Sequence, residues 1–413
     1  MLLPEAFIET TRKTMGEELF SRYLASFDEP SPVSIRINPF KDAELDGVLT
    51  ENVEEVPWCK YGRYLPERPN FTFDPMFHAG CYYVQEASSM FVAQIMQQYV
   101  EGDVSMLDLC AAPGGKSTCV RSYLTDKSVL VCNEPIRNRA NILYENITKF
   151  GTHNTFVTNN YPADFRKTKL KFDVVLADVP CSGEGMFRKD PATISEWSPQ
   201  NVDKCSRLQR DIVADIWPHL ADGGILIYST CTFNTKEDEE NVRWICENLG
   251  AECLPVDTKP EWNIVGSLSE GFDAPVYRFI PGHTRGEGIF CCVMRKHGLR
   301  TGKVKPISVA DLSQLRVMTP ELLAKASSVV EALKADSHFG ENEKVELTSE
   351  QAIAYLRRES IVLPQDTPRG MIVVTYRKQP LGFVKNVGSR ANNLYPQPWA
   401  IRTTHNIPTN KNI

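Results

Sequence analysis

The chain has 413 residues, 42% of them hydrophobic, so it can bury the cores of two or three domains. No apolar run approaches the ~18 residues of a membrane span, and the first residues lack the apolar core of a signal peptide. We therefore expect a cytoplasmic protein without a membrane partner. In a reducing compartment the twelve cysteines should stay thiols, and the sequence has neither a CxxC pair nor a zinc-spaced His/Cys cluster, so we predict no metal site.

The formal net charge of −6 is unevenly distributed. Residues 351–413 contain nine Lys and Arg against two acidic residues, a balance of +7, which leaves −13 for residues 1–350. This asymmetry fits an acidic catalytic body with a basic arm that holds phosphates. A basic, solvated tail domain explains the charge equally well.

The first part of the chain, residues 1–75, predicts a small mixed unit. Apolar residues at helical spacing between Phe7 and Leu24 precede the segment SIRINPF, whose alternation is typical of a strand. From residue 76 to 297, short apolar runs alternate with helical stretches, and this predicts a doubly wound parallel sheet. We expect strands in VSMLDL, SVLVCNE, TFVTN, DVVLAD, GILIYS and GIFCCVMR, and helices after Gly115 and at 136–150, 203–220 and 236–249.

The last part of the chain has a different composition. Residues 298–345 are polar and include the charged run GENEKVE, which indicates a linker. From residue 346 to 413, the short strands MIVVTYR and QPLGFVK alternate with turn residues. This pattern predicts a small β-rich domain.

The turn after the first strand of the predicted sheet indicates a cofactor site. Its small residues would let the backbone approach a ligand at the start of the next helix. Glu134, nineteen residues beyond Gly115, ends the following strand, where a carboxylate can accept both hydroxyls of a ribose. The turn matches neither GxGxxG nor GxxxxGK[ST], so S-adenosylmethionine, an adenosine without phosphates, fits best; an ordinary tight turn is the alternative. The turn comprises Cys110, Ala111, Ala112, Pro113, Gly114, Gly115 and Lys116.

Two cysteines follow strand runs at the edge where this ligand is expected. Cys181 comes after FDVVLAD, and Cys231 comes after GILIYST. If these strands are neighbours in a parallel sheet, they lie only ~5 Å apart and both thiols face one crevice. A single free cysteine is most often a buried structural thiol. Two at adjacent strand ends, with Asp178 beside one of them, favour paired thiol chemistry.

Such a pair suits methylation at carbon 5 of a pyrimidine. A thiolate that adds to carbon 6 turns the ring into an enamine, which can attack a methyl sulfonium from carbon 5. The carbon-5 proton must then leave and the thiolate must be eliminated. Asp178, in a partly dry pocket, could hold a proton at ring nitrogen 3 as charge develops. From the residues alone, either Cys181 or Cys231 could be the attacking thiol.

The loop after Cys181 predicts an RNA contact. Residues 183–189 offer flexible glycines, Phe187 for base stacking, and the cations Arg188 and Lys189 for phosphates. A solvated surface loop is the alternative reading. A thiolate cannot reach a base that is stacked in a helix, so the target should be unpaired or flipped out.

Several segments resemble, in order and spacing, the signatures of the Sun-type (NSUN) RNA cytosine-5 methyltransferases. The resemblance implies a Rossmann-like class I methyltransferase domain of α/β class at 76–297. It also implies a small α+β N-terminal domain at 1–75 that positions RNA, and a β-rich PUA-like RNA-binding domain at 346–413. The segments are SIRINP, HAGCYYVQEASSM, DLCAAPGGKST, CNEPIRNRA, ADVPCSGEGMFRKDP, YSTCTFNTKEDEENV and LGFVKNVGSRANNLYP.

The resemblance also implies roles for single residues. In this RNA family the Thr-Cys cysteine attacks, here Cys231, and the Pro-Cys cysteine, here Cys181, assists release of the methylated product. The implied cofactor contacts are residues 110–116, Glu134 and Asp178, and a family position that usually holds Asp or Glu falls on Asn160.

The implied substrate is cytosine in RNA, above all 16S ribosomal RNA or the small ribosomal subunit. Two alternatives stay open: transfer RNA as the substrate, and a ribosome-assembly factor without turnover. The presence of both thiols and of Asp178 speaks against the second.

Overall fold

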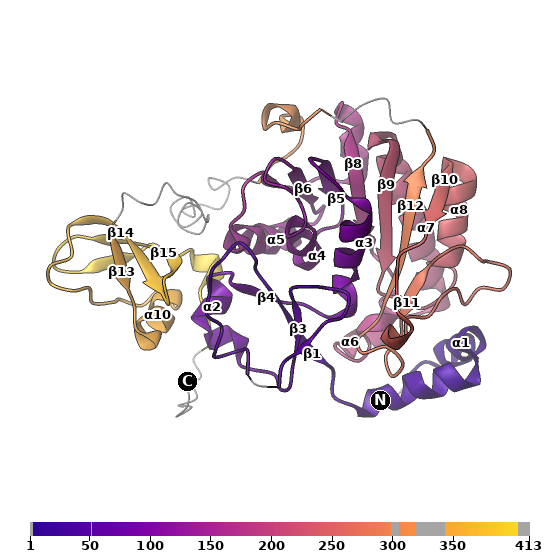
Figure 1. Cartoon of the computed structure of the whole chain (residues 1–413), viewed down its shortest axis with the longest axis horizontal. Coiled ribbons are helices and arrows are strands. Elements are labelled where there is room, and N and C mark those ends of the chain that lie inside the picture. The colour runs from indigo at the N-terminus through magenta and orange to yellow at the C-terminus, as the bar shows by residue number, and fades with distance from the viewer. Residues whose placement is uncertain (1–2, 51, 299–304, 319–342, 404–413) are drawn as a thin grey trace.

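The computed structural model describes residues 3–50, 52–298, 305–318 and 343–403 (Figure 1). These residues form an eight-stranded central sheet and two four-stranded sheets, one from each end of the chain. No helix in the described ranges combines the length and the apolar character that crossing a bilayer requires.

The central sheet has the strand order β10-β12-β9-β8-β5-β6-β7, and β11 pairs with β12 at one side. The five strands from β9 to β7 are parallel, which confirms the predicted doubly wound sheet. The strands are β5 (Ser105–Asp108), β6 (Val129–Asn133), β7 (Thr155–Thr158), β8 (Phe172–Asp178), β9 (Leu220–Thr230), β10 (Ala251–Leu254), β11 (Tyr277–Phe279) and β12 (Ile289–Lys296).

The predicted strand GIFCCVMR exists as β12, but it runs antiparallel to β9 and β10 rather than parallel. The connection from β10 to β12 contains no α-helix. Because parallel neighbours need a crossover, usually a helical one, a strand that returns without it pairs antiparallel. Cys291 and Cys292 within β12 are buried in the core, as expected.

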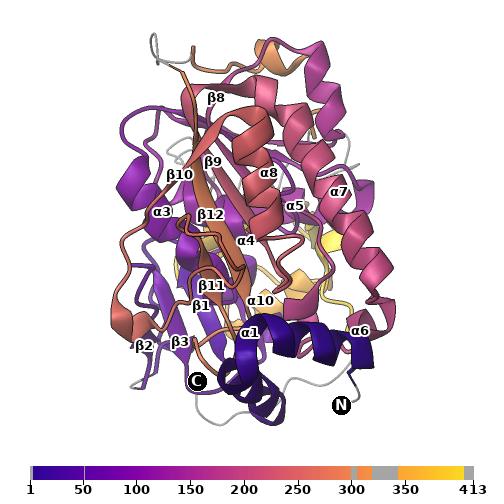
Figure 2. The same ribbon diagram turned by 90° about the vertical axis from the view of Figure 1, so that its right-hand side faces the viewer.

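Helices cover both faces of the central sheet (Figures 1 and 2). Successive side chains of a strand point to opposite faces, so Met106 joins one core with α4 and α5, whereas Leu107 joins another with α7 and α8. α7 begins earlier than predicted because the Ser198 side chain caps the N–H of Asn201. The helices are α3 (Val92–Tyr99), α4 (Gly115–Arg121), α5 (Arg137–Phe150), α6 (Ala192–Glu196), α7 (Pro199–Ile216) and α8 (Glu239–Leu249).

The N-terminal region consists of helix α1 and a sheet of order β2-β3-β1-β4. The sequence predicted that this unit ends at residue 75, but its sheet includes β4, which lies beyond that residue. Figure 2 shows α1 across the end of the central domain, next to α6. Phe7 of α1 packs there, with its ring centroid 5.0 Å from that of Phe187. The elements are α1 (Glu5–Ala25), β1 (Val33–Ile37), β2 (Glu54–Glu55), β3 (Gly62–Leu65), α2 (Pro75–His78) and β4 (Tyr82–Val84).

The C-terminal sheet has the order β13-β14-β15-β16 and contains the two predicted strands as β14 and β15. It packs against the α2 region, where Gln379 Nε2 donates to the Asp42 carbonyl at 2.6 Å. Of the charged run GENEKVE, residues 340–342 lie outside the described ranges. The elements are β13 (Lys344–Glu346), α10 (Ser349–Leu356), β14 (Gly370–Tyr376), β15 (Gln379–Asn386) and β16 (Ala391–Asn393).

Candidate active site

The strand order has a switch point beside β5, where a ligand crevice is expected in a sheet of this kind. The chain runs from β5 outward to β6 and β7, and then returns to the other side of β5 as β8. In an open α/β sheet, ligands bind outside the carboxyl ends of the strands at such a switch point. The turn 110–116 follows β5, and the loop with Cys181 follows β8, so the fold brings both predicted parts of the site to this crevice.

The two thiols meet as the sequence predicted. β8 and β9 are parallel neighbours, with Asp178 opposite Ser229. The Sγ atoms of Cys181 and Cys231 lie 3.1 Å apart, and both cysteines are free. The two strand ends therefore bring both sulfur atoms within reach of a single bound molecule.

Hydrogen bonds between the two loops fix the relative position of the backbones that carry the two thiols. Val179 N donates to the Ser229 carbonyl at 3.0 Å, and Gly185 N donates to the Cys231 carbonyl at 2.9 Å. Because these bonds join backbone to backbone, they position Cys181 and Cys231 without depending on either side chain.

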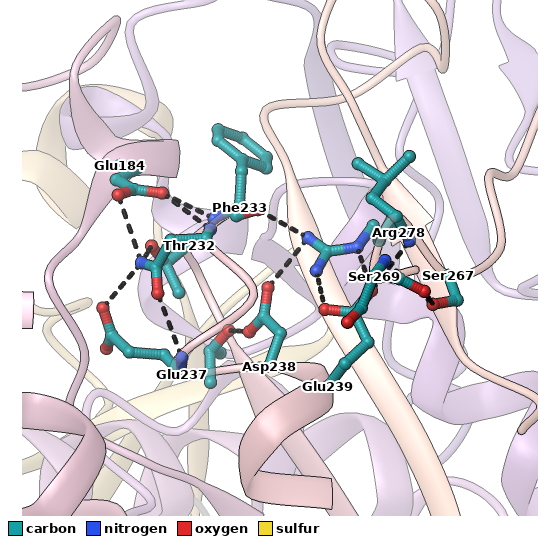
Figure 3. A network of polar contacts seen from close by, with 12 residues as sticks. Glu184, Thr232, Phe233, Glu237, Asp238, Glu239, Ser267, Ser269 and Arg278 are labelled. Atoms are coloured by element: carbon teal, nitrogen blue, oxygen red, sulfur yellow. Dashed lines mark hydrogen bonds and ion pairs between the residues drawn. The ribbon is translucent and has the colours of Figure 1, made fainter. Parts of the chain in front are cut away.

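Buried charges hold residues 231–234, the loop that carries Cys231, in place (Figure 3). Both oxygens of Glu184 accept hydrogen bonds, and one accepts from the N–H groups of Phe233 at 2.7 Å and Asn234 at 3.0 Å. Arg278 donates to the Phe233 carbonyl at 2.9 Å and forms ion pairs with Asp238 at 2.8 Å and with Glu239. Neither Glu184 nor Arg278 was expected here, because only the fold brings them to residues 231–234.

The expectation for loop 183–189 is wrong for two of its three proposed RNA contacts. Phe187 is 0% exposed and packs against Phe7 of α1. The Arg188 side chain is 8% exposed and pairs with Glu287 at 3.1 Å. Helix α1 covers this loop and buries the Phe187 side chain in the core. Of the three proposed contacts, only Lys189 is exposed.

The contact between the thiols makes them electrostatically unequal. It lowers the pKa of Cys231, and the Lys116 ammonium acts in the same direction, although burial and Asp178 oppose them. The same contact and burial raise the pKa of Cys181 well above its usual range. Either sulfur can donate across this contact; with Cys181 as the donor, the Cys231 thiolate accepts, and Cys231 is the more readily ionised of the two.

Lys116, the last residue of the turn 110–116, pairs with Asp178 near the thiols. Its Nζ donates to Asp178 Oδ2 at 2.8 Å, while Ser229 Oγ donates to Asp178 Oδ1 at 2.7 Å. Burial would lower the pKa of Lys116, but the adjacent Asp178 outweighs it and raises this pKa. Asp178 therefore has both oxygens engaged, and the positive charge of Lys116 acts on Cys231.

Glu134 fits the expected ribose. Its side chain is 1% exposed, and Oε1 accepts from the Ile136 N–H at 2.9 Å. Oε2 lies 3.7 Å from Arg139 and accepts no hydrogen bond from any described residue. A buried carboxylate oxygen with spare acceptor capacity matches a ligand hydroxyl.

Gly114 lets the turn 110–116 pack closely against α5. Gly114 has φ 112°, in the left-handed region, and a Cβ there would lie 3.2 Å from the Leu143 side chain. Only glycine meets both conditions without strain. Asp108 ends β5 beneath this turn, with one oxygen that lacks a partner among the described residues, and burial raises its pKa to about 7.

Asn160 lies where expected, after β7 and close to Glu134, but its side chain is already engaged. Its Oδ1 accepts from the Arg316 N–H at 3.0 Å, and its Nδ2 donates to the Arg316 carbonyl at 3.4 Å. The fully buried Asn133 joins the ends of β5 and β7, because its Nδ2 donates to the Leu109 and Asn160 carbonyls. No pattern in the sequence marked Asn133. No group of three or more metal-binding side chains occurs in the described part of the chain.

Family models match three consecutive parts of the chain. Residues 3–87 match the N-terminal domain of 16S rRNA methyltransferase RsmF, 94–295 match 16S rRNA methyltransferase RsmB/F, and 342–401 match the methyltransferase RsmF PUA domain.

Curated relatives are similar over the same length. The ribosomal RNA small subunit methyltransferase F of Cronobacter sakazakii is 30% identical over 96% of both chains. The protein of that name from Pectobacterium atrosepticum is 33% identical over 74% of this chain and 64% of its own.

Solved structures share the fold. A methyltransferase homologue from Pyrococcus horikoshii has a TM-score of 0.60 and 26% identity over 71% of this chain and 95% of its own. NSun6 from the same organism, solved with the S-adenosylmethionine analogue SFG, has a TM-score of 0.60 at 19% identity over 72% of this chain and 99% of its own. The comparisons confirm the predicted Rossmann-like fold, PUA-like domain and cofactor class. The chain belongs to the 16S rRNA methyltransferase RsmB/F family and is an S-adenosylmethionine-dependent methyltransferase.

Proposed function

We propose that the protein methylates carbon 5 of a cytosine in 16S ribosomal RNA through a covalent bond between Cys231 and carbon 6. The observation that carries this proposal is the 3.1 Å contact between the thiols of Cys181 and Cys231, beside the Lys116–Asp178 pair. Relatives named ribosomal RNA small subunit methyltransferase F support the choice of RNA.

The first step uses the lowered pKa of Cys231. Its thiolate adds to carbon 6, so that a sulfur–carbon bond forms, the C5–C6 double bond opens and carbon 5 becomes nucleophilic. Charge develops at ring nitrogen 3, which takes up a proton from the Lys116 ammonium through Asp178, the carboxylate that accepts from Lys116 and Ser229. S-adenosylmethionine, when bound, supplies an electrophilic methyl group on sulfur.

Product release reverses the covalent bond. Solvent water takes the carbon-5 proton, the electron pair of that C–H bond re-forms the C5–C6 double bond, the sulfur–carbon bond breaks, and Cys231 returns to the thiolate. Nitrogen 3 gives its proton back to the Asp178 pair. Cys181 lies 3.1 Å from the departing sulfur, and we assign it to this step.

For the cofactor, we assign the ribose hydroxyls to Glu134 and the methionine end to the turn 110–116. The Glu134 oxygen that accepts no hydrogen bond from any described residue supports the first assignment, and the place of the turn after β5, at the switch point of the sheet, supports the second. For the RNA, we assign binding to residues 1–75 and 346–413 on either side of the methyltransferase domain at 76–297, with 298–345 as the connection.

The test is methyl transfer to defined RNAs. Purified protein and S-adenosylmethionine with a labelled methyl group are incubated separately with 16S rRNA, small subunits and transfer RNA, and bisulfite sequencing locates each modified base. We expect 5-methylcytosine in 16S rRNA or in the subunit, and none with the Cys231→Ala variant. If the label appears in transfer RNA alone, the substrate is transfer RNA and not 16S ribosomal RNA. No label in any RNA from folded protein would favour an assembly factor without turnover.

A further inference from the structure

Residues 305–318, here named the edge segment, extend the central sheet beside the cofactor crevice (orange in Figure 1). Val317 forms an antiparallel bridge with Thr158 of β7. Asn159 N donates to the Arg316 carbonyl at 2.9 Å, and Met318 N donates to the Val157 carbonyl at 2.7 Å. The segment thus pairs with the strand that otherwise ends this side of the sheet.

Apolar side chains dock the edge segment independently of these hydrogen bonds. Leu312 is fully buried, and Leu315 and Ile307 are nearly so. All three belong to the core on the α7 and α8 face of the sheet. Burial of this apolar surface makes the docked position of residues 305–318 favourable on its own.

The edge segment is hydrogen bonded to the loop that carries the proposed ribose contact. Asn159 Nδ2 donates to the carbonyls of Glu134 at 2.8 Å and Pro135 at 2.9 Å, and its Oδ1 accepts from the Arg316 guanidinium at 3.4 Å. Polar contacts therefore run without a gap from the segment through Asn159 to Glu134.

Asn160 completes this connection. Both polar atoms of its side-chain amide bond to the backbone of Arg316. Oδ1 accepts from the N–H, and Nδ2 donates to the carbonyl. Aspartate could accept from this N–H but could not donate to the carbonyl. Asparagine at position 160 can therefore form both hydrogen bonds with the Arg316 backbone, whereas aspartate can form only one.

We propose that the edge segment is part of the cofactor site, and that Asn160 is a positioning residue for it rather than an adenine contact. The segment fixes Asn159, Asn159 fixes the backbone at Glu134, and the carboxylate of Glu134 is thereby aimed into the crevice. This inference rests on the proposed cofactor site. It adds to that site a stretch of chain that lies more than 150 residues from Glu134 in the sequence.

The experiment combines amide hydrogen exchange with calorimetric binding of S-adenosylmethionine. Asn160→Ala removes the amide, and Leu312→Ala undocks the segment from its apolar side without touching the crevice. In both variants we expect faster exchange at Asn159 and over residues 313–318, and a Kd for S-adenosylmethionine raised about tenfold, the equivalent of one or two hydrogen bonds. Leu208→Ala, the same change at an exposed position of α7, is the matched control and should alter neither the exchange rates nor the Kd.

Three outcomes separate the possible failures. If Asn160→Ala weakens binding while exchange stays at the wild-type level, Asn160 contacts the cofactor directly and the inference is wrong. If Leu312→Ala accelerates exchange while the Kd is unchanged, the segment plays no part in the site. Wild-type affinity in Glu134→Ala would instead refute the proposed ribose contact itself. Should Leu312→Ala fail to fold, Asn160→Ala still decides between the first outcome and the proposal.

Discussion

The replacement of Arg278 by alanine tests how the loop of Cys231 is held in place. Arg278 is 0% exposed, pairs with Asp238 and Glu239, and donates to the Phe233 carbonyl (Figure 3). Removal of one partner from a buried ion pair costs about 3–5 kcal/mol, because the other charge stays buried without compensation. Arg278→Ala leaves two such carboxylates, so we expect a loss at the upper end of this range.

Urea-induced unfolding, followed by tryptophan fluorescence, measures this loss. Arg278→Lys retains the charge but lacks the planar fork that donates to three groups, and it should lose about 2 kcal/mol. The control is Arg285→Ala, which breaks an exposed 2.9 Å pair with Glu54 and should cost about 1 kcal/mol or less. An Arg278→Ala protein as stable as the control variant would refute the view that buried charge anchors this loop.

Three further predictions concern the thiols, a buried lysine and the basic domain. Cys181→Ala removes the donor that lowers the pKa of Cys231, so alkylation of Cys231 by iodoacetamide at pH 7 should slow; an unchanged rate would contradict the electrostatic argument. Burial lowers the pKa of Lys41 to about 8. Between this value and about 10.5 the Lys41 ammonium of the unfolded chain binds more protons, so the contribution of Lys41 to the free energy of unfolding should rise with pH by at most about 3 kcal/mol; the difference in unfolding free energy between wild type and Lys41→Met, measured across this pH range, should show this rise, and a constant difference would contradict it. Alanine at three exposed cations of the C-terminal domain should lower RNA affinity and reduce the slope of log K against log salt by about 2, whereas an unchanged slope would remove this surface from the RNA interface. These cations are Arg369, Lys385 and Arg390.

The pairing of Cys181 with Cys231 could be predicted because it follows from local pattern. Each thiol comes directly after an apolar strand run, and parallel neighbours present their carboxyl ends at the same edge. The place of Glu134 follows for the same reason. These inferences needed only the order of strands, which alternating strands and helices largely determine.

The rest depends on contacts between distant parts of the chain. Arg278 reaches Phe233 across 45 residues, and the Arg316 backbone reaches Asn160 across 156. Phe187 looked like an exposed stacking residue only because the sequence does not show that Phe7 covers it. Whether a polar or aromatic side chain is buried depends on how whole helices and strands pack together. The spacing of nearby residues in the sequence does not predict it.

The most direct test of the central claim is the search for a covalent protein–RNA complex. Cys181→Ala should retain attack by Cys231 but fail at release, so that a slow, nuclease-sensitive band accumulates on a denaturing gel. The Cys181→Ala, Cys231→Ala double variant should lose the band. No band from folded Cys181→Ala protein, or a band that survives in the double variant, would contradict covalent catalysis through Cys231.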